Sequence, residues 1–373
     1  MDILEEIQNC PVEWKELGEV CEIVRGVRIT KKELIEKGFP VVSGGTSFMG
    51  YTNKYNREAN TITIAQYGTA GYVDWQSEKF WANDVCFSVY PRKSILNRFL
   101  YYFLKNKQNY LYEISNRTAV PYSISKEKIL RIKIPIPPLE IQEKIVQILD
   151  KMTEYVTELT SELTSRKKQY SYYRDKLLSF EDEVYQVEWK ILKDIATLKN
   201  GKDWKNLPIG DIPVYGSGGE MGEFVADYSY DKPTVLIPRK GSISNLFYLE
   251  KAFWNVDTIY YTEIDETKII PKYFYYYLTT VNLEEMSTNP TRPSLTQAIL
   301  DKIKIPVPSL EIQSRIVQVL DNFDKVCHDL NIGLPKEIEL RQKQYEFFRE
   351  KLLTFTAEGE YTDSGQWHGR NLT

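Results

Sequence analysis

Apolar residues recur at alternating three- and four-residue steps in two stretches of the chain. The first stretch runs from Ile145 to Phe180, interrupted only at Arg166, and the second runs from Ile316 to Phe355. So narrow a stripe must be covered by another helix, because a helix resting on a globular core shows a wider apolar face. The pattern therefore predicts two long helices with a shared coiled-coil seam, made of Ile145, Leu149, Met152, Val156, Leu159, Leu163, Ile316, Leu320, Phe323, Leu330, Leu334, Phe348 and Leu352.

The second stretch contains an irregularity. Two four-residue steps fall together between Leu330 and Ile338, and the same segment holds Gly333 and Pro335. Four extra residues disturb a heptad seam, and a proline inside a helix kinks or breaks it. We therefore predict a break or kink in the second helix, whereas the first is a continuous spacer roughly 50 Å long.

The chain is also an internal repeat. Residues 134–150 (IPIPPLEIQEKIVQILD) match residues 305–321 (IPVPSLEIQSRIVQVLD) at twelve of seventeen positions, and the offset is 171. The helix ends RKKQYSYYRDKLLSF and RQKQYEFFREKLLTF repeat with an offset of 175. A repeat this long indicates a duplicated globule with its helix. We divide the chain into a first globule at 1–137, a first spacer helix at 138–185, a second globule at 186–308, a second spacer helix at 309–356, and a polar tail at 357–373 that is expected to be disordered.

Both globules are predicted to be mixed α/β, of the α+β class. Runs rich in β-branched residues at 61–64 and 234–237 are typical of short strands between turns. The tyrosine-rich segments 99–104 and 273–278 favour helices. Because the first long helix leads from one globule to the other, the second must return along it. The connectivity thus predicts an antiparallel helix pair separating the globules, pseudo-twofold and nearly circular. The alternative is a parallel seam between two chains of a homodimer.

Composition narrows the function classes. A net charge of −4 argues against polyanion binding by the whole surface but allows a local basic face. No apolar run is long enough to cross a membrane. The four cysteines (Cys10, Cys21, Cys86, Cys327) are scattered and form no CxxC pair, as expected for reduced thiols in the cytoplasm.

The sequence offers no set of residues with a catalytic pattern. A phosphate-binding GxxxxGK[ST] loop is absent, and the glycine-rich run 216–219 is not GxGxxG. Of the two histidines, His328 falls in the second helix and His368 in the tail. We therefore expect a non-catalytic protein with no cofactor and no metal; an enzyme with an unrecognised site is the alternative.

Each globule has glycine-rich loops with basic or aromatic neighbours. Glycine lets a backbone approach a surface closely, arginine and lysine neutralise phosphates, and arginine or glutamine can contact base edges. Any one loop is explained by ordinary turn chemistry, but recurrence at matching places in both copies favours DNA binding. The side chains differ between copies, which suits two different short sequences. The candidate DNA-binding residues are Ser43, Gly44, Gly45, Thr46, Gln66, Tyr67, Gly68, Thr69, Arg117, Tyr122, Ser217, Gly218, Gly219, Arg239, Lys240, Gly241, Ser242 and Arg292.

Three repeated motifs together resemble the specificity subunit of a type I DNA restriction–modification system. They are IP-x-P-x-LEIQ beginning at Ile134 and Ile305, the helix ends QY…KLL-x-F, and VEWK beginning at Val12 and Val187. The resemblance covers nearly the whole chain. It implies that each globule is a target recognition domain for one half of a split, asymmetric site in double-stranded DNA, with the helices setting the gap. It also implies two modification subunits, which methylate adenine with S-adenosylmethionine, and restriction motor–nuclease subunits as partners.

A duplicated module also suits a scaffold that bridges two copies of a protein partner without binding DNA. The two hypotheses differ in one outcome. A selection from random oligonucleotides would enrich a sequence for the DNA-specificity subunit and none for the scaffold.

Overall fold

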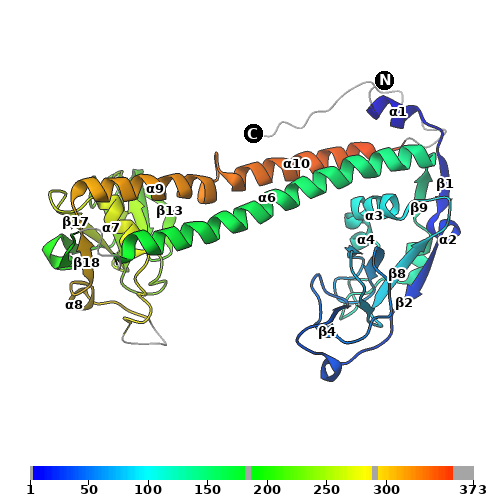
Figure 1. Ribbon diagram of the computed structural model, residues 1–373, viewed down its shortest axis with the longest axis horizontal. Coiled ribbons are helices and arrows are strands. Elements are labelled where there is room, and N and C mark those ends of the chain that lie inside the picture. The colour runs from blue at the N-terminus through cyan, green and yellow to red at the C-terminus, as the bar shows by residue number, and fades with distance from the viewer. Residues whose placement is uncertain (1–2, 181–185, 288–292, 356–373) are drawn as a thin grey trace. The chain divides into compact units, whose positions relative to one another are not determined.

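The computed structural model describes residues 3–180, 186–287 and 293–355 (Figure 1). It divides into two compact units. The first unit comprises Met1–Glu158 and Glu339–Thr373, and the second comprises Leu159–Ile338. Each unit therefore holds one globule together with parts of the long helices. The predicted tail at 357–373 lies outside the described residues.

The globule of the first unit contains nine strands and six short helices among its described residues. The strands form a four-stranded sheet, a three-stranded sheet and a two-stranded ribbon. They are β1 (Glu13–Glu16), β2 (Cys21–Arg25), β3 (Phe39–Val42), β4 (Tyr51–Thr52), β5 (Thr61–Ala65), β6 (Val73–Gln76), β7 (Trp81–Ala82), β8 (Cys86–Pro91) and β9 (Lys133–Ile136). The helices are α1 (Ile3–Asn9), α2 (Leu17–Val20), η1 (Lys31–Glu33), α3 (Asn97–Asn106), α4 (Gln108–Glu113) and α5 (Lys126–Leu130).

The globule of the second unit repeats this plan. Its strands are β10 (Glu188–Ile191), β11 (Ala196–Asn200), β12 (Ile209–Gly216), β13 (Gly219–Val225), β14 (Thr234–Pro238), β15 (Phe247–Leu249), β16 (Trp254–Asn255), β17 (Ile259–Ile264) and β18 (Lys304–Val307). Its short helices are η2 (Leu192–Asp194), α7 (Pro271–Leu278) and α8 (Gln297–Leu300).

The sheet topologies of the two globules correspond strand for strand. Sheet β2-β8-β5-β6 matches β11-β17-β14-β15, sheet β4-β3-β7 matches β13-β12-β16, and ribbon β1-β9 matches β10-β18. Even the register agrees, since Trp14 pairs with Pro135 in one ribbon and Trp189 with Pro306 in the other. The predicted α+β class and the duplication of the globule are confirmed.

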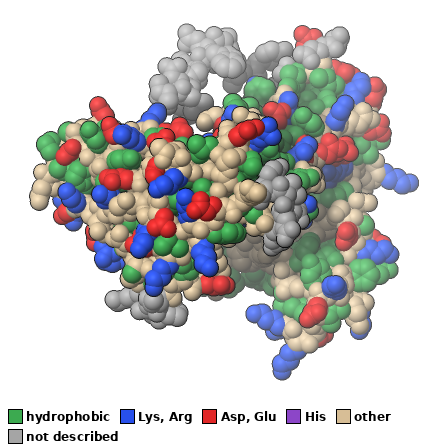
Figure 2. Space-filling model, turned by 60° about the vertical axis from the view of Figure 1, so that its left-hand side comes forward, with side chains coloured by type: hydrophobic (Ala, Val, Ile, Leu, Met, Phe, Trp, Pro, Cys, Tyr) green, Lys and Arg blue, Asp and Glu red, His purple; other side chains and the backbone are tan. Residues whose placement is uncertain are grey.

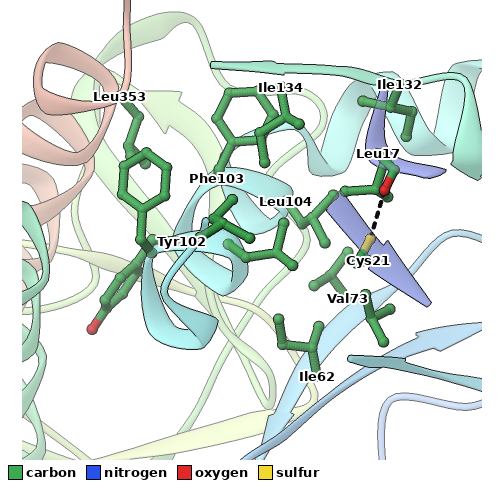
Figure 3. Close-up of a cluster of buried hydrophobic side chains, with 14 of the residues drawn as sticks. Leu17, Cys21, Ile62, Val73, Tyr102, Phe103, Leu104, Ile132, Ile134 and Leu353 are labelled. Atoms are coloured by element: carbon green, nitrogen blue, oxygen red, sulfur yellow. Dashed lines mark hydrogen bonds between the residues drawn. The ribbon is translucent and has the colours of Figure 1, made fainter. Parts of the chain in front are cut away.

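A tyrosine- and phenylalanine-rich helix fills the core of each globule. In the first unit, Tyr102, Phe103 and Leu104 of α3 are at most 1% exposed. Figure 3 shows them among strand residues such as Ile62 and Val73. Burying one large apolar side chain contributes roughly 1.5–3 kcal/mol, so this helix anchors the sheet beneath it. Helix α7 has the same place in the second core, with Tyr273 and Phe274 fully buried.

Two buried thiols provide a test of the packing inside the first globule. The Cys21 thiol donates a hydrogen bond to the Leu17 carbonyl oxygen at 2.9 Å, and burial raises its pKa to about 12 (Figure 3). Burial also raises the pKa of Cys86 to about 12. The thiolate reacts with iodoacetamide, so we expect neither cysteine to be labelled in the native protein at about pH 8, and both to be labelled in urea.

The same pKa shifts set the sign of a pH effect on stability. Because folding raises both pKa values, the two thiols favour the folded state below the ordinary thiol pKa of 9.0, and this contribution is lost as the pH rises toward 12. Mass spectrometry of labelled peptides measures the reactivity directly. Equal labelling rates with and without urea would show that these thiols are not in a closed core.

Three long helices follow the predicted stripes. They are α6 (Leu139–Ser179), α9 (Leu310–His328) and α10 (Leu334–Leu352). Helix α6 is continuous through Arg166, and the predicted break lies between α9 and α10. The Asp329 carboxylate accepts the Asn331 N–H at 2.7 Å there, which favours a turn over another helical residue. A side chain at Gly333 would also place its Cβ 2.5 Å from the Lys325 carbonyl oxygen.

The long helices pair in antiparallel fashion within each unit. In the first unit, the Arg341 guanidinium of α10 lies 5.2 Å from the ring of Tyr155 on α6. In the second unit, Tyr173 of α6 stacks on Phe323 of α9 with ring centroids 5.7 Å apart, and Tyr170 contacts His328. Residue numbers rise along α6 and fall along its partner. The seam is therefore intramolecular, and the parallel homodimer seam is wrong.

The residues of the predicted seam fall into two groups, those that pack into the globular cores and those that lie along the helices outside these cores. The ends of the seam belong to the globular cores, with Ile145, Leu149 and Leu352 in the first and Ile316 and Leu320 in the second. Leu159 is buried in the middle of α6. The half-buried positions are Met152, Val156, Leu163, Phe323, Leu334 and Phe348.

The prediction is wrong for one seam residue. Leu330 is 71% exposed, because it lies in the break after α9, where the chain has left the helical path. Ile332 in the same turn is 75% exposed. Leu330 follows the heptad spacing of α9, but it lies beyond the end of that helix and so does not share its face.

Candidate nucleic-acid interface

Three loops of the first globule meet at the ends of β3 and β5. The Thr69 N–H donates to the Gly44 carbonyl oxygen at 2.8 Å, and the Gly68 N–H donates to the Tyr122 carbonyl oxygen at 3.0 Å. A Cβ at Gly44 would lie 2.2 Å from the Tyr67 carbonyl oxygen, so only glycine allows this approach. The sequence-predicted loops at 43–46, 66–69 and 117–122 are thus brought together.

The corresponding loops meet in the second globule. The Ser217 N–H donates to the Thr258 hydroxyl at 3.2 Å, and a Cβ at Gly241 would lie 3.0 Å from the Ser217 hydroxyl. Lys240 pairs with Ser294 in an isolated antiparallel bridge. The loops at 217–219 and 239–242 therefore form one cluster, while Arg292 lies outside the described residues.

The two loop clusters share a backbone design. The bridge between Lys240 and Ser294 matches one between Tyr67 and Ser123. Gly68 has a φ angle of 79° and Gly241 one of 80°. This is a left-handed conformation that other residues adopt only under strain. Equivalent backbones thus carry unlike side chains, which is the property that the comparison of the two sequence copies predicted.

The residues of these clusters differ in how far they are exposed to solvent. Gly45, Thr46, Gly68, Gly218, Lys240, Gly241 and Ser242 are exposed, Ser43, Gly44, Gln66, Tyr67, Thr69, Ser217 and Arg239 are half-buried, and Gly219 is buried. Tyr122 is 48% exposed. The Ser43 hydroxyl accepts a hydrogen bond from the Asn83 amide at 3.2 Å. Arg117 is exposed, its Nε donates to the Tyr112 carbonyl oxygen at 3.3 Å, and its guanidinium lies over the Tyr112 ring.

Buried polar residues of the repeated LEIQ…LD segment, which sequence reasoning missed, attach each long helix to its globule. The Gln142 side chain accepts from the Leu96 N–H at 2.8 Å and donates to the Ser94 and Pro137 carbonyl oxygens. Gln313 makes the equivalent bonds with Ile270, Lys268 and Pro308. The recurrence of this glutamine in both copies was the available signal.

The closing aspartate of the same segment holds the core helix. The Tyr102 hydroxyl donates to Asp150, and Arg98 pairs with the same carboxylate at 2.7 Å. In the second unit Tyr276 donates to Asp321, which pairs with Lys272 at 3.0 Å. The motif therefore fixes the direction in which each long helix leaves its globule.

Each unit also has a groove along its helix pair. In the first unit the groove is about 600 Å³ and includes Ile148, Met152 and Tyr155 of α6 with Arg341 of α10. In the second it is about 470 Å³ and includes Val319, Phe323 and Val326 of α9 with Arg166 of α6. These residues correspond through the repeat offsets of 171 and 175. The same surface is therefore present twice.

Figure 2 shows acidic and basic side chains interspersed over the face in view. Within the second loop cluster, the Lys240 ammonium lies 3.9 Å from the Asp257 carboxylate, a distance that leaves it open to another anion. The described residues include no group of three or more potential metal ligands and no helix apolar and long enough to span a membrane.

Comparison with known proteins places these features in a family. A family model described as the type I restriction modification DNA specificity domain matches residues 11–166 and again residues 186–340. The chain belongs to this family. It is a specificity subunit, the non-catalytic component of a type I restriction–modification complex, with two target recognition domains.

Individual relatives agree with this assignment. The specificity subunit is 33% identical to a putative type I restriction enzyme specificity subunit of Haemophilus influenzae over 94% of this chain and 97% of the relative. It is 32% identical to the EcoR124I/EcoR124II specificity subunit of Escherichia coli, over 95% and 97%. The crystal structure of an S subunit from M. genitalium has the same fold, with a TM-score of 0.67, 23% identity, and coverage of 94% and 98%.

Proposed function

We propose that the specificity subunit reads a bipartite, asymmetric site in double-stranded DNA and directs methyltransferase and restriction subunits to it, in the cytoplasm. One observation carries the proposal. Two loop clusters with equivalent backbones present different side chains, Gln66-Tyr67 in one unit and Arg239-Lys240 in the other. A shared frame with unlike polar groups suits the recognition of two unlike sequences in the same manner.

The continuous helix supplies the spacing element of the proposal. Helix α6 runs without a break from Leu139 to Ser179. At the usual helical rise, a helix of this size is about 60 Å long. Antiparallel partners stiffen it in both units. Two weak half-site contacts joined by a stiff spacer reinforce each other only when the gap matches, so the helices would act as a ruler.

The two equivalent grooves favour the binding of two copies of one protein partner. Each groove combines apolar side chains with an arginine, as an amphipathic helix would require. We assign both grooves to the modification subunits, because a partner that docks twice needs the same surface twice. A scaffold that bridges two such subunits without reading DNA would use these grooves equally well.

A selection from a random duplex library separates the two functions. The full chain with its modification subunits should enrich two short sequences at a fixed separation. Enrichment of no sequence would leave only the scaffold.

DNA binding is expected to depend less steeply on salt concentration when one loop residue, Lys240, is replaced. Lys240→Ala should weaken DNA binding evenly across sequences and lower the slope of log affinity against log salt concentration by about one, because one phosphate contact is lost. Exposed Lys193 of η2 offers a matched control, and Lys193→Ala should leave the slope unchanged. Fluorescence anisotropy at several salt concentrations measures both. Identical slopes for the two variants would remove Lys240 from the interface.

A further inference from the structure

Gln66 and Arg239 occupy the same position in the two loop clusters. The Gln66 N–H donates to the Val85 carbonyl oxygen and the Arg239 N–H to that of Thr258, both at 2.8 Å. The Gln66 and Arg239 carbonyl oxygens each accept a backbone N–H at 2.9 Å, from Ile124 and Leu295 respectively. The backbone at this position is therefore held on both sides by corresponding residues, and the two positions differ in their side chains.

Among the described residues, neither side chain forms a hydrogen bond or an ion pair. The Gln66 amide oxygen is shielded from solvent and has no hydrogen-bond partner among the described residues. The Arg239 guanidinium lies 5.8 Å from the centre of the Tyr260 ring, and within the described parts of the chain it forms no ion pair or side-chain hydrogen bond. Contact with a ring face orients a guanidinium while leaving its N–H donors available.

Arg57 of the first globule shows how an arginine is used to hold this fold together. The Arg57 guanidinium donates to the Ser88 hydroxyl and to the carbonyl oxygens of Asn56 and Arg25. That arginine is used to hold strands together. Among the described residues, the Gln66 amide oxygen and the Arg239 guanidinium have no such partners. Turning the Gln66 side chain outward to a ligand therefore breaks no hydrogen bond of its amide oxygen.

We propose that Gln66 and Arg239 are equivalent base-reading residues, Gln66 for an A·T pair and Arg239 for a G·C pair. The glutamine amide places an N–H donor beside a carbonyl acceptor, so it can donate to N7 of adenine and accept from its N6 amino group, and the guanidinium places two N–H donors side by side, which can donate to O6 and N7 of guanine. Gly68 and Gly241, two residues further on, let the backbone come close to the duplex. This assignment rests on the proposed function of reading DNA.

Exchange of the two side chains tests the assignment. The original chain and its two variants, Arg239→Gln and Gln66→Arg, are each produced in a host together with the modification subunits. Methylated adenines are then mapped by single-molecule sequencing. Arg239→Gln should change one position of the second half-site from G·C to A·T and leave the first half-site intact. Gln66→Arg should change one position of the first half-site from A·T to G·C. Each variant should methylate the original site about ten- to a hundredfold more slowly.

Lys240→Gln is the matched control, because it removes a positive charge one residue away. It should slow methylation without changing any preferred base. Co-purification of each variant with the modification subunits checks folding, and Arg239→Lys, which keeps the charge but loses the planar fork, should relax the choice of base at the same position. An unchanged base preference in both exchange variants, with a defined site for the original chain, would overturn the base assignment alone. No defined site for the original chain would overturn the proposed function as well.

Discussion

Removing seven residues from α6 and the facing seven from α10 should shorten the gap between the half-sites by about three base pairs, with both half-sequences unchanged. One heptad rises about 10 Å, and base pairs stack about 3.4 Å apart. The segments to remove are 152–158 and 338–344, because Tyr155 and Arg341 face each other there. A whole heptad keeps the seam in register, so the apolar stripes on either side rejoin correctly.

Paired changes make this deletion informative. Inserting one heptad at the same two places should lengthen the gap by about three base pairs. Deleting 152–158 alone should instead weaken the helix pairing, because α10 is then seven residues longer than the part of α6 that it pairs with. Methylated-adenine mapping reads out the gap in each case. A gap that stays constant in both the double deletion and the double insertion would mean that the helices are not the ruler.

Gln142→Leu should lower the free energy of unfolding of the first unit by about 3 kcal/mol. Leucine fills a similar volume but leaves the Leu96 N–H and the Ser94 and Pro137 carbonyl oxygens without their partner. Each buried unsatisfied group costs about 1–3 kcal/mol. The side chain is fully buried, so water does not replace the bonds. Urea denaturation followed by fluorescence measures the loss.

Gln147→Leu is the matched control, since Gln147 lies on the same helix and is exposed. It should change stability by less than about 0.5 kcal/mol. Gln313→Leu should repeat the effect of Gln142→Leu in the second unit, because its three hydrogen bonds are equivalent. If Gln142→Leu unfolded at the same urea concentration as Gln147→Leu, the glutamine would not be what joins helix and globule.

The sequence predicted the features that depend on local periodicity and on the repeat. The stripe from Ile145 onward predicted a continuous helix, and Gly333 with Pro335 predicted the break after α9, because both follow from backbone geometry. The loops were identified as DNA-binding candidates because glycines recur at matching places in both copies. Their positive φ angles at Gly68 and Gly241 give the physical reason for that recurrence.

The sequence pattern did not predict features that depend on contacts between residues far apart in the chain. Ile145 and Leu149 follow heptad spacing, yet they pack into the globule, since the start of a helix cannot show which surface will cover it. Leu330 was assigned to the seam because spacing alone does not register a change in chain direction. The hydrogen bond from Arg117 to the Tyr112 carbonyl oxygen was equally beyond the pattern, because it depends on where α4 places that oxygen.

The central claim is that two unlike recognition surfaces act at a fixed spacing, and a map of methylated adenines in a host that produces this chain with its modification subunits tests it most directly. The account predicts a single motif of two different short sequences separated by a constant number of unspecified base pairs. A continuous motif, a palindrome, or half-sequences found at variable separations would contradict it.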